Sequence, residues 1–328
     1  MNNSVSQELL KFLQKSPTAF HAVQQMKSEL LAVDFTELKE NQRWNIECGK
    51  HYFVTRNDSS LIAFTIPENG IDKMHILTSH SDSPTFKIKE NPEIEVEKHY
   101  VKLNVEKYGG MLCAPWFDRP LSVAGRVIIK DKTNGQFASK LVNIDRDLVM
   151  IPNLAIHMNR EINSGYNYNA QKDLLPLYGC GSPKGTFMEQ IVEAAGVEKD
   201  EILGHDLFLY NRQEGSIWGA SEEFISSGRL DDLQCAFASL QGFLSGEKRD
   251  CMAVHCVLDN EEVGSGTKQG AASTFLKDTL LRIHNGLGRT YEEYLMTLAG
   301  SFMISADNAH ALHPNYIEKA DPVNRPLP

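Results

Sequence analysis

The stretch "CMAVHCVLDNEEVGSGT", residues 251–267, carries an apolar run that ends at Leu258, two adjacent glutamates just beyond it, and then glycines. Near-continuous apolar runs of this kind are typical of strands covered on both faces, as in a mostly parallel sheet with helices on either side. Ligands of such sheets bind beyond the carboxyl ends of the strands. The stretch therefore predicts an α/β fold and places Glu261 and Glu262 where a ligand binds.

Patterns on both sides of that stretch extend the prediction. Short apolar runs that are typical of strands end at His80 in "KMHILTSH" and at Ser305 in "SFMIS". Apolar residues recur at helical spacing over 6–33, from Leu230 onwards and around 271–283. We therefore expect a mostly parallel sheet that is covered by helices.

The middle of the chain has a different period. Apolar and polar residues alternate there, as in "VKLNV" (101–105), and "DKTNGQ" (131–136) is typical of a hairpin turn. This pattern favours a β-rich module inserted into the α/β domain. The predicted division is a catalytic domain in two parts, 1–87 and 206–328, with the β-rich insertion over 88–205.

Composition excludes several classes of function. The chain has 328 residues, 41% of them hydrophobic, and a net charge of -10, which disfavours binding to a nucleic-acid backbone. No window approaches the roughly 18 apolar residues that a membrane span needs. The six cysteines show no CxxC pairing. We therefore expect no nucleic-acid or membrane partner, and a reducing, cytoplasmic location.

Acidic residues converge on the predicted ligand edge of the sheet. A single acid after a strand is most often a solvated loop residue or a helix N-cap, but several acids at one edge are harder to explain in that way. Crowded carboxylates repel one another unless they share protons or bind a cation. The residues at this edge are His80 and Asp82 after one strand, Glu261 and Glu262 after the second, Asp307 after the third, and Asp231 at the start of a helix.

Carboxylates with one imidazole and no thiolate suit Zn, Mn or Co better than a structural cysteine site. One aspartate can bridge two ions about 3.5–4 Å apart, an arrangement that activates water and polarises a carbonyl. Adjacent glutamates on a bend can then divide the work, with Glu262 binding metal and Glu261 acting as general base. The spacing of His80 and Asp82 fits a pair in which the carboxylate orients the imidazole.

These residues lie in motifs that resemble the aspartyl aminopeptidases, a family of dinuclear zinc exopeptidases. The motifs are "SHSDSP", "SGRLDDL", "DNEEVGS" and "SADNAHALHPNY", together with "KSPTAFHAV", "WFDRPLSVAGRV" and "NLAIHMNRE". The resemblance implies a zinc-peptidase fold of the phosphorylase/hydrolase-like kind with an inserted dimerisation domain. It implies that one zinc is held by His80, Asp231 and Asp307, that Asp231 bridges to a second zinc held by Glu262, and that Glu261 is the base.

The same resemblance implies a function and an assembly. The expected reaction removes N-terminal Asp or Glu from peptides through a hydroxide that bridges two zinc ions. His157 is expected to reach a neighbouring subunit's active site in a homo-oligomer, a dodecamer built from dimers. Alternatives are a neutral-residue aminopeptidase or a deacylase on the same scaffold, or an inactive truncated assembly protein.

The chain departs from the family pattern in two places. Asp232 stands where the family usually has asparagine, so a swap of roles between Asp231 and Asp232 stays open. Family members also continue to a late histidine that completes the second zinc's ligands, whereas no histidine follows His313 here. We therefore expect the second site, with Asp231 and Glu262 alone, to bind metal more weakly.

Overall fold

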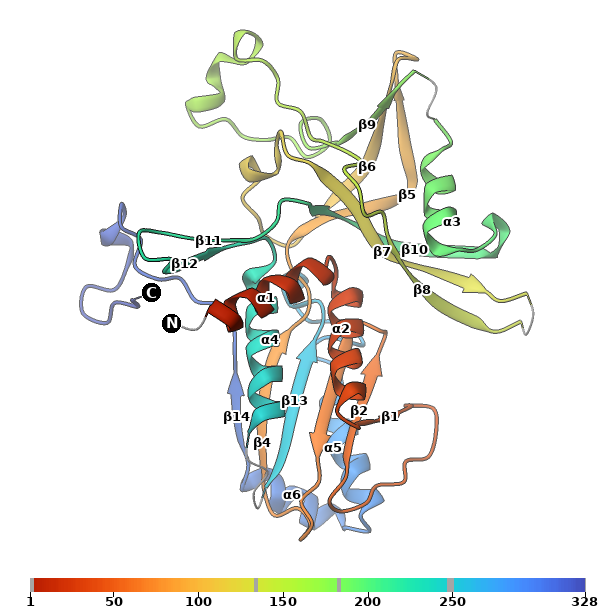
Figure 1. Ribbon diagram of the computed structural model, residues 1–328, viewed down its shortest axis with the longest axis vertical. Helices are drawn as coiled ribbons and strands as arrows, with labels where there is room; N and C mark the ends of the chain where they lie inside the picture. Colours follow the sequence, from red (N-terminus) through yellow and green to blue (C-terminus); the bar gives the residue numbers. More distant parts are fainter. Residues whose placement is uncertain (1–2, 133–134, 182–183, 247–250, 328) are drawn as a thin grey trace.

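Strands β4 (Met74–His80) and β13 (Met252–Leu258) lie side by side and parallel in the computed structural model, which describes residues 3–132, 135–181, 184–246 and 251–327 (Figure 1). The register pairs His80 with Leu258, the last residue of each strand. Because the strands are parallel, their carboxyl ends meet at one edge. The segments that follow them are therefore neighbours in space.

These two strands belong to the six-stranded sheet A, whose order is β1-β2-β3-β13-β4-β14. The pairs β1–β2, β13–β4 and β14–β4 are parallel, whereas β3 pairs antiparallel with both β2 and β13. The predicted mostly parallel α/β fold is confirmed, although β2 and β3 are absent from the sequence-based prediction. The remaining strands are β1 (Thr36–Leu38), β2 (His51–Arg56), β3 (Ser60–Thr65) and β14 (Phe302–Ser305).

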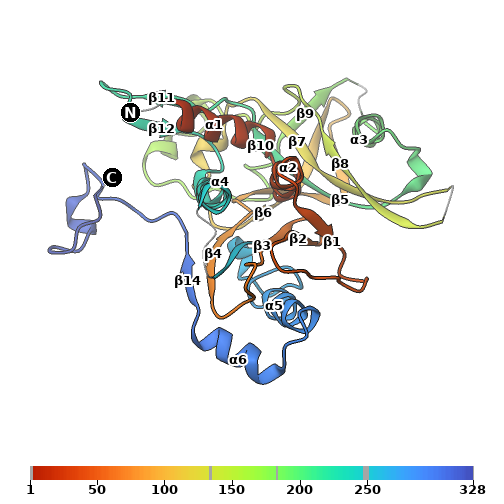
Figure 2. The same cartoon turned by 60° about the horizontal axis from the view of Figure 1, so that its bottom comes forward.

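Helices cover both faces of sheet A, as Figure 2 shows. One face carries α1 (Asn3–Lys15), α2 (Ala19–Ala32) and α4 (Leu230–Ser245), and the other carries α5 (Phe275–Gly286) and α6 (Tyr291–Ala299). Along β3, alternate side chains face opposite helical layers. Leu61 and Ala63 pack against the layer of α1, α2 and α4, while Ile62 and Phe64 pack against the layer of α5 and α6. Apolar residues on both faces are what a buried strand requires.

A second, antiparallel sheet B lies across the carboxyl edge of sheet A, in the order β8-β7-β10-β5-β6-β9 (Figure 1). Its strands run from Thr85 to Asn211, so we propose that they form the predicted insertion with slightly wider bounds. Residues 133–134 of the expected hairpin turn lie outside the described residues. The strands are β5 (Thr85–Val96), β6 (Tyr100–Tyr108), β7 (Leu121–Lys130), β8 (Phe137–Asn143), β9 (Leu177–Cys180) and β10 (Ile202–Asn211).

Smaller elements complete the chain. Helix α3 (Phe187–Ala195) packs on sheet B, and β11 (Ser216–Trp218) pairs with β12 (Phe224–Ser226) in a separate hairpin. Within the described ranges, no helix is long and apolar enough to cross a membrane. Short 3-10 turns span Ala114–Trp116, Ile156–Met158, Arg160–Asn163, Lys199–Glu201, Glu261–Val263 and Ile317–Lys319.

Candidate metal centre

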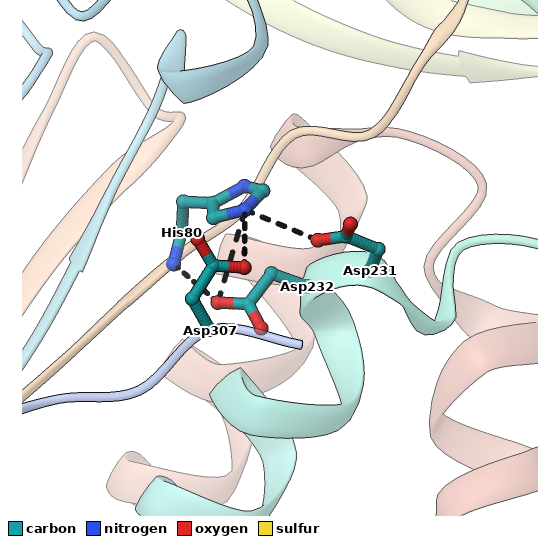
Figure 3. Close-up of side chains that lie close together, drawn as sticks. All are labelled: His80, Asp231, Asp232 and Asp307. Atoms are coloured by element: carbon teal, nitrogen blue, oxygen red, sulfur yellow. Dashed lines mark hydrogen bonds and ion pairs between the residues drawn. The ribbon is translucent and has the colours of Figure 1, made fainter. Parts of the chain in front are cut away.

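Four side chains from three segments converge at the carboxyl edge of sheet A (Figure 3). His80 is the last residue of β4, Asp231 and Asp232 open α4, and Asp307 follows β14. The Asp231–Asp232 peptide bond is cis, and neither residue has helical backbone angles. One nitrogen or oxygen atom from each of the four lies within 4.8 Å of the others. We call these four residues the donor cluster.

The donor cluster is arranged around the imidazole Nε2 of His80. This atom lies 3.4 Å from Asp231 Oδ1, 3.8 Å from Asp307 Oδ1 and 3.9 Å from Asp232 Oδ2. The side chains of Asp231 and Asp307 are about half exposed, so the cluster opens towards solvent on that side. An imidazole with carboxylates and no thiolate is a donor set that suits zinc or another divalent ion. The residues present therefore fit the expected metal.

The electrostatics of the cluster indicate an excess of negative charge. Burial lowers the pKa of His80, but the hydrogen bond with Asp82 and the charges of Asp82, Asp232 and Glu261 outweigh burial and raise it to about 9. Burial raises the pKa of Asp232 to about 6, although hydrogen bonds from Cys235 and His80 oppose this shift. Asp232 Oδ1 is buried and has no hydrogen-bond partner among the described residues. A bound cation would compensate these charges.

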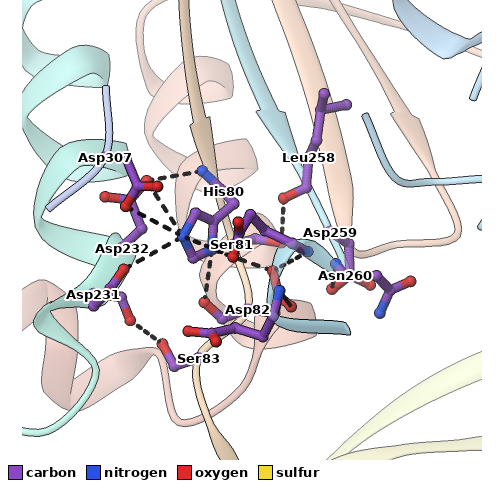
Figure 4. A network of polar contacts seen from close by, with 12 residues as sticks. His80, Ser81, Asp82, Ser83, Asp231, Asp232, Leu258, Asp259, Asn260 and Asp307 are labelled. Atoms are coloured by element: carbon purple, nitrogen blue, oxygen red, sulfur yellow. Dashed lines mark hydrogen bonds and ion pairs between the residues drawn. The ribbon is translucent and has the colours of Figure 1, made fainter. Parts of the chain in front are cut away.

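Asp82 lies on the side of the His80 ring that faces away from Asp231, Asp232 and Asp307 (Figure 4). His80 Nδ1 is 3.1 Å from the main-chain oxygen of Asp82 and 3.3 Å from its Oδ1. A proton on Nδ1 would be held there, which leaves the lone pair of Nε2 for a metal. The Asp82 carboxylate also accepts hydrogen bonds from the main-chain N–H groups of Glu261 and Glu262, at 3.1 and 3.2 Å.

The two glutamates lie on the 3-10 turn Glu261–Val263, separated by two residues from the end of β13, and we call it the glutamate turn. Asn260 before the turn has φ 63° and Gly264 after it has φ 94°, so the chain bends sharply at both ends. Glu261 Oε2 lies 3.9 Å from His80 Nε2 and its side chain is half exposed. Burial, followed by the charges of Asp231 and Asp82, raises the pKa of Glu262 to about 7. Glu262 itself lies outside the donor cluster.

His157 is the one candidate that the chain does not bring near these residues. It lies in the exposed 3-10 turn Ile156–Met158, in the long connection between β8 and β9. Figure 1 shows this connection beyond sheet B, away from the ends of β4 and β13. Within one chain, His157 is therefore a surface residue.

Sequence reasoning leaves the role of one residue of this centre open and misses another. Asp232 is expected as an extra charge that could exchange roles with Asp231; it is fully buried, and its Oδ2 accepts a 3.0 Å hydrogen bond from the main-chain N–H of His80. Tyr108 ends β6 of sheet B, and its hydroxyl donates to Asp82 Oδ2 at 2.7 Å. The apolar residue that follows Asp232 in "LDDLQ" marks the inner face of α4, a signal that could have identified Asp232. The sequence carries no comparable signal for Tyr108.

A mostly parallel sheet that gathers an imidazole and carboxylates at the carboxyl ends of its strands, beside a candidate general base, defines a metal-dependent hydrolase. Comparison with known families narrows this class. The family described as "Aminopeptidase I zinc metalloprotease (M18)" matches residues 12–328. The chain belongs to this family and is a zinc aminopeptidase of the M18 type.

Individual relatives agree with the family assignment. A probable M18 family aminopeptidase 2 of Clostridium novyi is 48% identical over 99% of this chain and 77% of its own length. The cryo-electron microscopy structure of the Ape4 and Nbr1 complex contains a chain that is 34% identical, with a TM-score of 0.93 over 99% of this chain and 67% of that one. The mApe1 dodecamer of S. cerevisiae is 27% identical, with a TM-score of 0.86 over 99% of this chain and 76% of its own.

Proposed function

We propose that this zinc aminopeptidase releases N-terminal Asp or Glu from peptides, with two zinc ions at the carboxyl edge of sheet A. The observation that supports this most directly is the donor cluster, whose ligand atoms lie within 4.8 Å of one another. Glu261 beside it supplies a carboxylate of the kind that serves as general base. A metal site and a base together are what hydrolysis of a peptide bond requires.

Each side chain has a proposed task. His80, Asp231 and Asp307 would hold the first ion, while Asp231 and Glu262 would hold the second. When bound, zinc would lower the pKa of a water molecule towards 7 and polarise the scissile carbonyl. Glu261 would take the proton from the attacking water and pass it to the leaving amine.

Asp82 and Asp232 would orient rather than bind. Asp82 lies on the Nδ1 side of His80, opposite the proposed metal position, and fixes the ring and the glutamate turn together. Asp232 is held by the main-chain N–H of His80, so its Oδ2 is already engaged. This favours Asp231, whose side chain is half exposed, as the bridging ligand.

The preference for acidic residues has support in the charge of a neighbouring groove. A groove of about 600 Å³ extends from Asp231, and both Arg119 and Arg229 line it. Arg119 donates to the neutral amide of Gln213 and forms no ion pair with any acid in the described part of the chain. A positive charge that no acid neutralises would attract an acidic substrate side chain.

A substrate panel tests this function. We expect the zinc-loaded protein to cleave Asp- and Glu-anilides at least about tenfold faster, in kcat/KM, than the Leu-anilide, which corresponds to roughly 1.4 kcal/mol of discrimination. Arg119→Gln is expected to narrow that ratio. Preference for the Leu-anilide would support a neutral-residue aminopeptidase, and cleavage of N-acyl amino acids alone would support a deacylase.

We also propose that the protein is a cytoplasmic homo-oligomer, a dodecamer as in the S. cerevisiae structure, in which His157 approaches a neighbour's substrate. Leu154, Ile156 and Met158 around it are about half exposed or more, which is typical of a surface that another chain covers. All six cysteines are free, as expected in a reducing compartment. Light scattering that finds a fully active monomer at micromolar concentration would contradict the shared site.

A further inference from the structure

The end of β6 is a point at which sheet B contacts the glutamate turn of sheet A. The Tyr108 hydroxyl donates to Asp82 Oδ2 at 2.7 Å and accepts from the side-chain amide of Asn260 at 2.8 Å. Asn260 is the residue that leads into the turn, and it has φ 63°. The Tyr108 hydroxyl therefore bonds both Asp82 and Asn260, the residue that precedes the two glutamates.

Asp82 receives donors on both of its carboxylate oxygens. Oδ1 faces His80 Nδ1 at 3.3 Å and the main-chain N–H of Glu261 at 3.1 Å. Oδ2 faces Tyr108 and the main-chain N–H of Glu262, at 3.2 Å for the latter. Among the described residues, Tyr108 is the single donor to this carboxylate that comes from sheet B. The Asp82 carboxylate therefore contacts His80 and the main chain of both glutamates, and it also accepts a hydrogen bond from a residue of sheet B.

Tyr108 is suited to donate and not to ionise. Burial, followed by the charges of Asp82 and Asp259, raises the pKa of its hydroxyl. The hydroxyl therefore keeps its proton for Asp82. The Tyr108 ring stands edge-on to Phe208 with ring centroids 5.6 Å apart, so the side chain has a fixed place in sheet B.

The next residue contacts the second glutamate directly. Gly109 has φ +76°, and a Cβ atom there would lie 3.0 Å from Glu262 Cβ and 3.2 Å from Glu262 Oε2. Contacts this short are tighter than nine in ten of those that real Cβ atoms make. Any side chain at position 109 would therefore have a strained backbone and would push Glu262 by a few tenths of an ångström.

We propose that Tyr108 and Gly109 position the metal centre: Tyr108 holds Asp82, and through it His80 and the glutamate turn, while Gly109 sets the place of the Glu262 carboxylate. This inference rests on the roles proposed above for His80, Asp82 and Glu262. Tyr108 is a positioning residue and does not touch the substrate. The consequence is that the docking of sheet B onto sheet A controls the geometry of the zinc ligands.

Tyr108 lines a cavity, so the hydrogen bonds of its hydroxyl can be removed without disturbing the packing of the ring. A cavity of about 330 Å³ between the two sheets is lined by Tyr108, Asp82 and Asn260. Loss of the hydroxyl therefore enlarges an existing space and leaves the ring in place. We expect Tyr108→Phe to fold normally while Asp82 loses its fixed donor.

The first test compares Tyr108→Phe with Tyr178→Phe in the zinc-loaded chain of 328 residues. Tyr178 is a matched control on sheet B, because its hydroxyl bonds the side chains of Thr186 and Gln190 and lies outside this network. We expect Tyr108→Phe to release zinc to a chelator about 10-fold faster, and to lower kcat by a similar factor with KM changed less than about twofold. Its Tm should match that of the control.

The second test compares Gly109→Ala with Gly70→Ala. Both glycines have left-handed backbone angles, φ +76° and φ +90°, but a Cβ atom at Gly70 meets nothing within 4 Å. The two variants therefore share the backbone penalty, and only Gly109→Ala presses on Glu262. We expect Gly109→Ala alone to weaken zinc binding and to change the absorption spectrum of the cobalt-substituted protein.

A double-mutant cycle decides whether Tyr108 acts through Asp82. In an Asp82→Ala background, Tyr108→Phe should cause no further increase in the zinc release rate. Equal release rates for Tyr108→Phe and Tyr178→Phe, or full additivity with Asp82→Ala, would overturn the proposal. If the wild-type chain binds zinc but does not cleave Asp- or Glu-anilides, the proposed substrate is wrong, and the release rates still decide the positioning role.

Discussion

His80 and His255 are both buried on adjacent strands of sheet A, yet their surroundings shift their pKa values in opposite directions. His80 ends β4 among carboxylates, and although burial lowers its pKa, Asp82 and the other acids raise it to about 9. His255 lies within β13, stacked on Phe243 with ring centroids 5.9 Å apart. Burial alone lowers its pKa to about 3.

The difference shows that position along the strand, and not burial, decides which imidazole is available for chemistry. Neither ring nitrogen of His255 has a hydrogen-bond partner within the described ranges, since only packed side chains reach the middle of the sheet. At the carboxyl edge, loops from distant parts of the chain bring oxygen atoms to His80. Chemistry on this sheet is therefore confined to its edge.

The largest effect is expected from Asp231, the proposed ligand of both metal ions. Asp231→Asn should remove both metals and reduce activity by about 10³–10⁴-fold, because metal supplies several kcal/mol of transition-state stabilisation. Asp232→Asn, the matched control, keeps an oxygen for the His80 N–H and should retain at least one metal. Metal analysis of the purified variants checks both outcomes. Equal metal loss from the two would mean that the bridge cannot be assigned to Asp231.

A smaller effect is expected when Glu261, the proposed general base, is changed alone. Glu261→Gln keeps the shape of the side chain but cannot accept a proton, so kcat should fall by about 10²–10⁴-fold with metal still bound. Glu292→Gln, on the exposed start of α6, serves as the control. Loss of metal in step with Glu261→Gln would show that the roles of the two glutamates are reversed.

The smallest effect concerns the imidazole in the middle of the sheet. Because the pKa of His255 falls from 6.5 in the unfolded chain to about 3 in the folded one, the unfolded state alone takes up a proton as the pH drops below 6.5. The stability that this histidine contributes is present above pH 6.5 and is lost progressively towards pH 3. Between pH 7 and pH 5, the wild type should lose about 2 kcal/mol more unfolding free energy than His255→Leu.

Urea unfolding of both proteins in the presence of a chelator measures this difference without a contribution from bound metal. An identical pH dependence in the two proteins would contradict a neutral, unpaired His255. It would also remove the contrast with His80.

The sequence predicts the parallel part of sheet A well, because β4 and β13 are apolar runs that end in polar residues. It does not predict β2 and β3, which pair with each other across the short turn 57–59. The antiparallel placement of β3 against β13 depends on packing between distant segments, and pairing of that kind is set by tertiary contacts.

The same distinction applies to the candidate site. His80 and Asp231 can be predicted because each stands at the end or start of an element with a clear period. The sequence marks Asp232 as a residue near the inner face of α4, but its bond to the main chain of His80, 152 residues away, carries no local signal. Tyr108 has no such mark, and its role comes from its contact with Asp82, 26 residues away. Glu262 has a predicted metal role, but its relation to Gly109 appears only when the two sheets are brought together.

The order of the donor cluster along the chain has a consequence for biosynthesis. His80 leaves the ribosome early, Asp231 and Asp232 follow after the whole of sheet B, and Asp307 emerges only after β14, the edge strand that pairs with β4. A nascent chain that ends before β14 holds an imidazole and two acids but lacks the third carboxylate of the cluster. The donor cluster therefore stays incomplete on the ribosome until the segment after β14 has emerged.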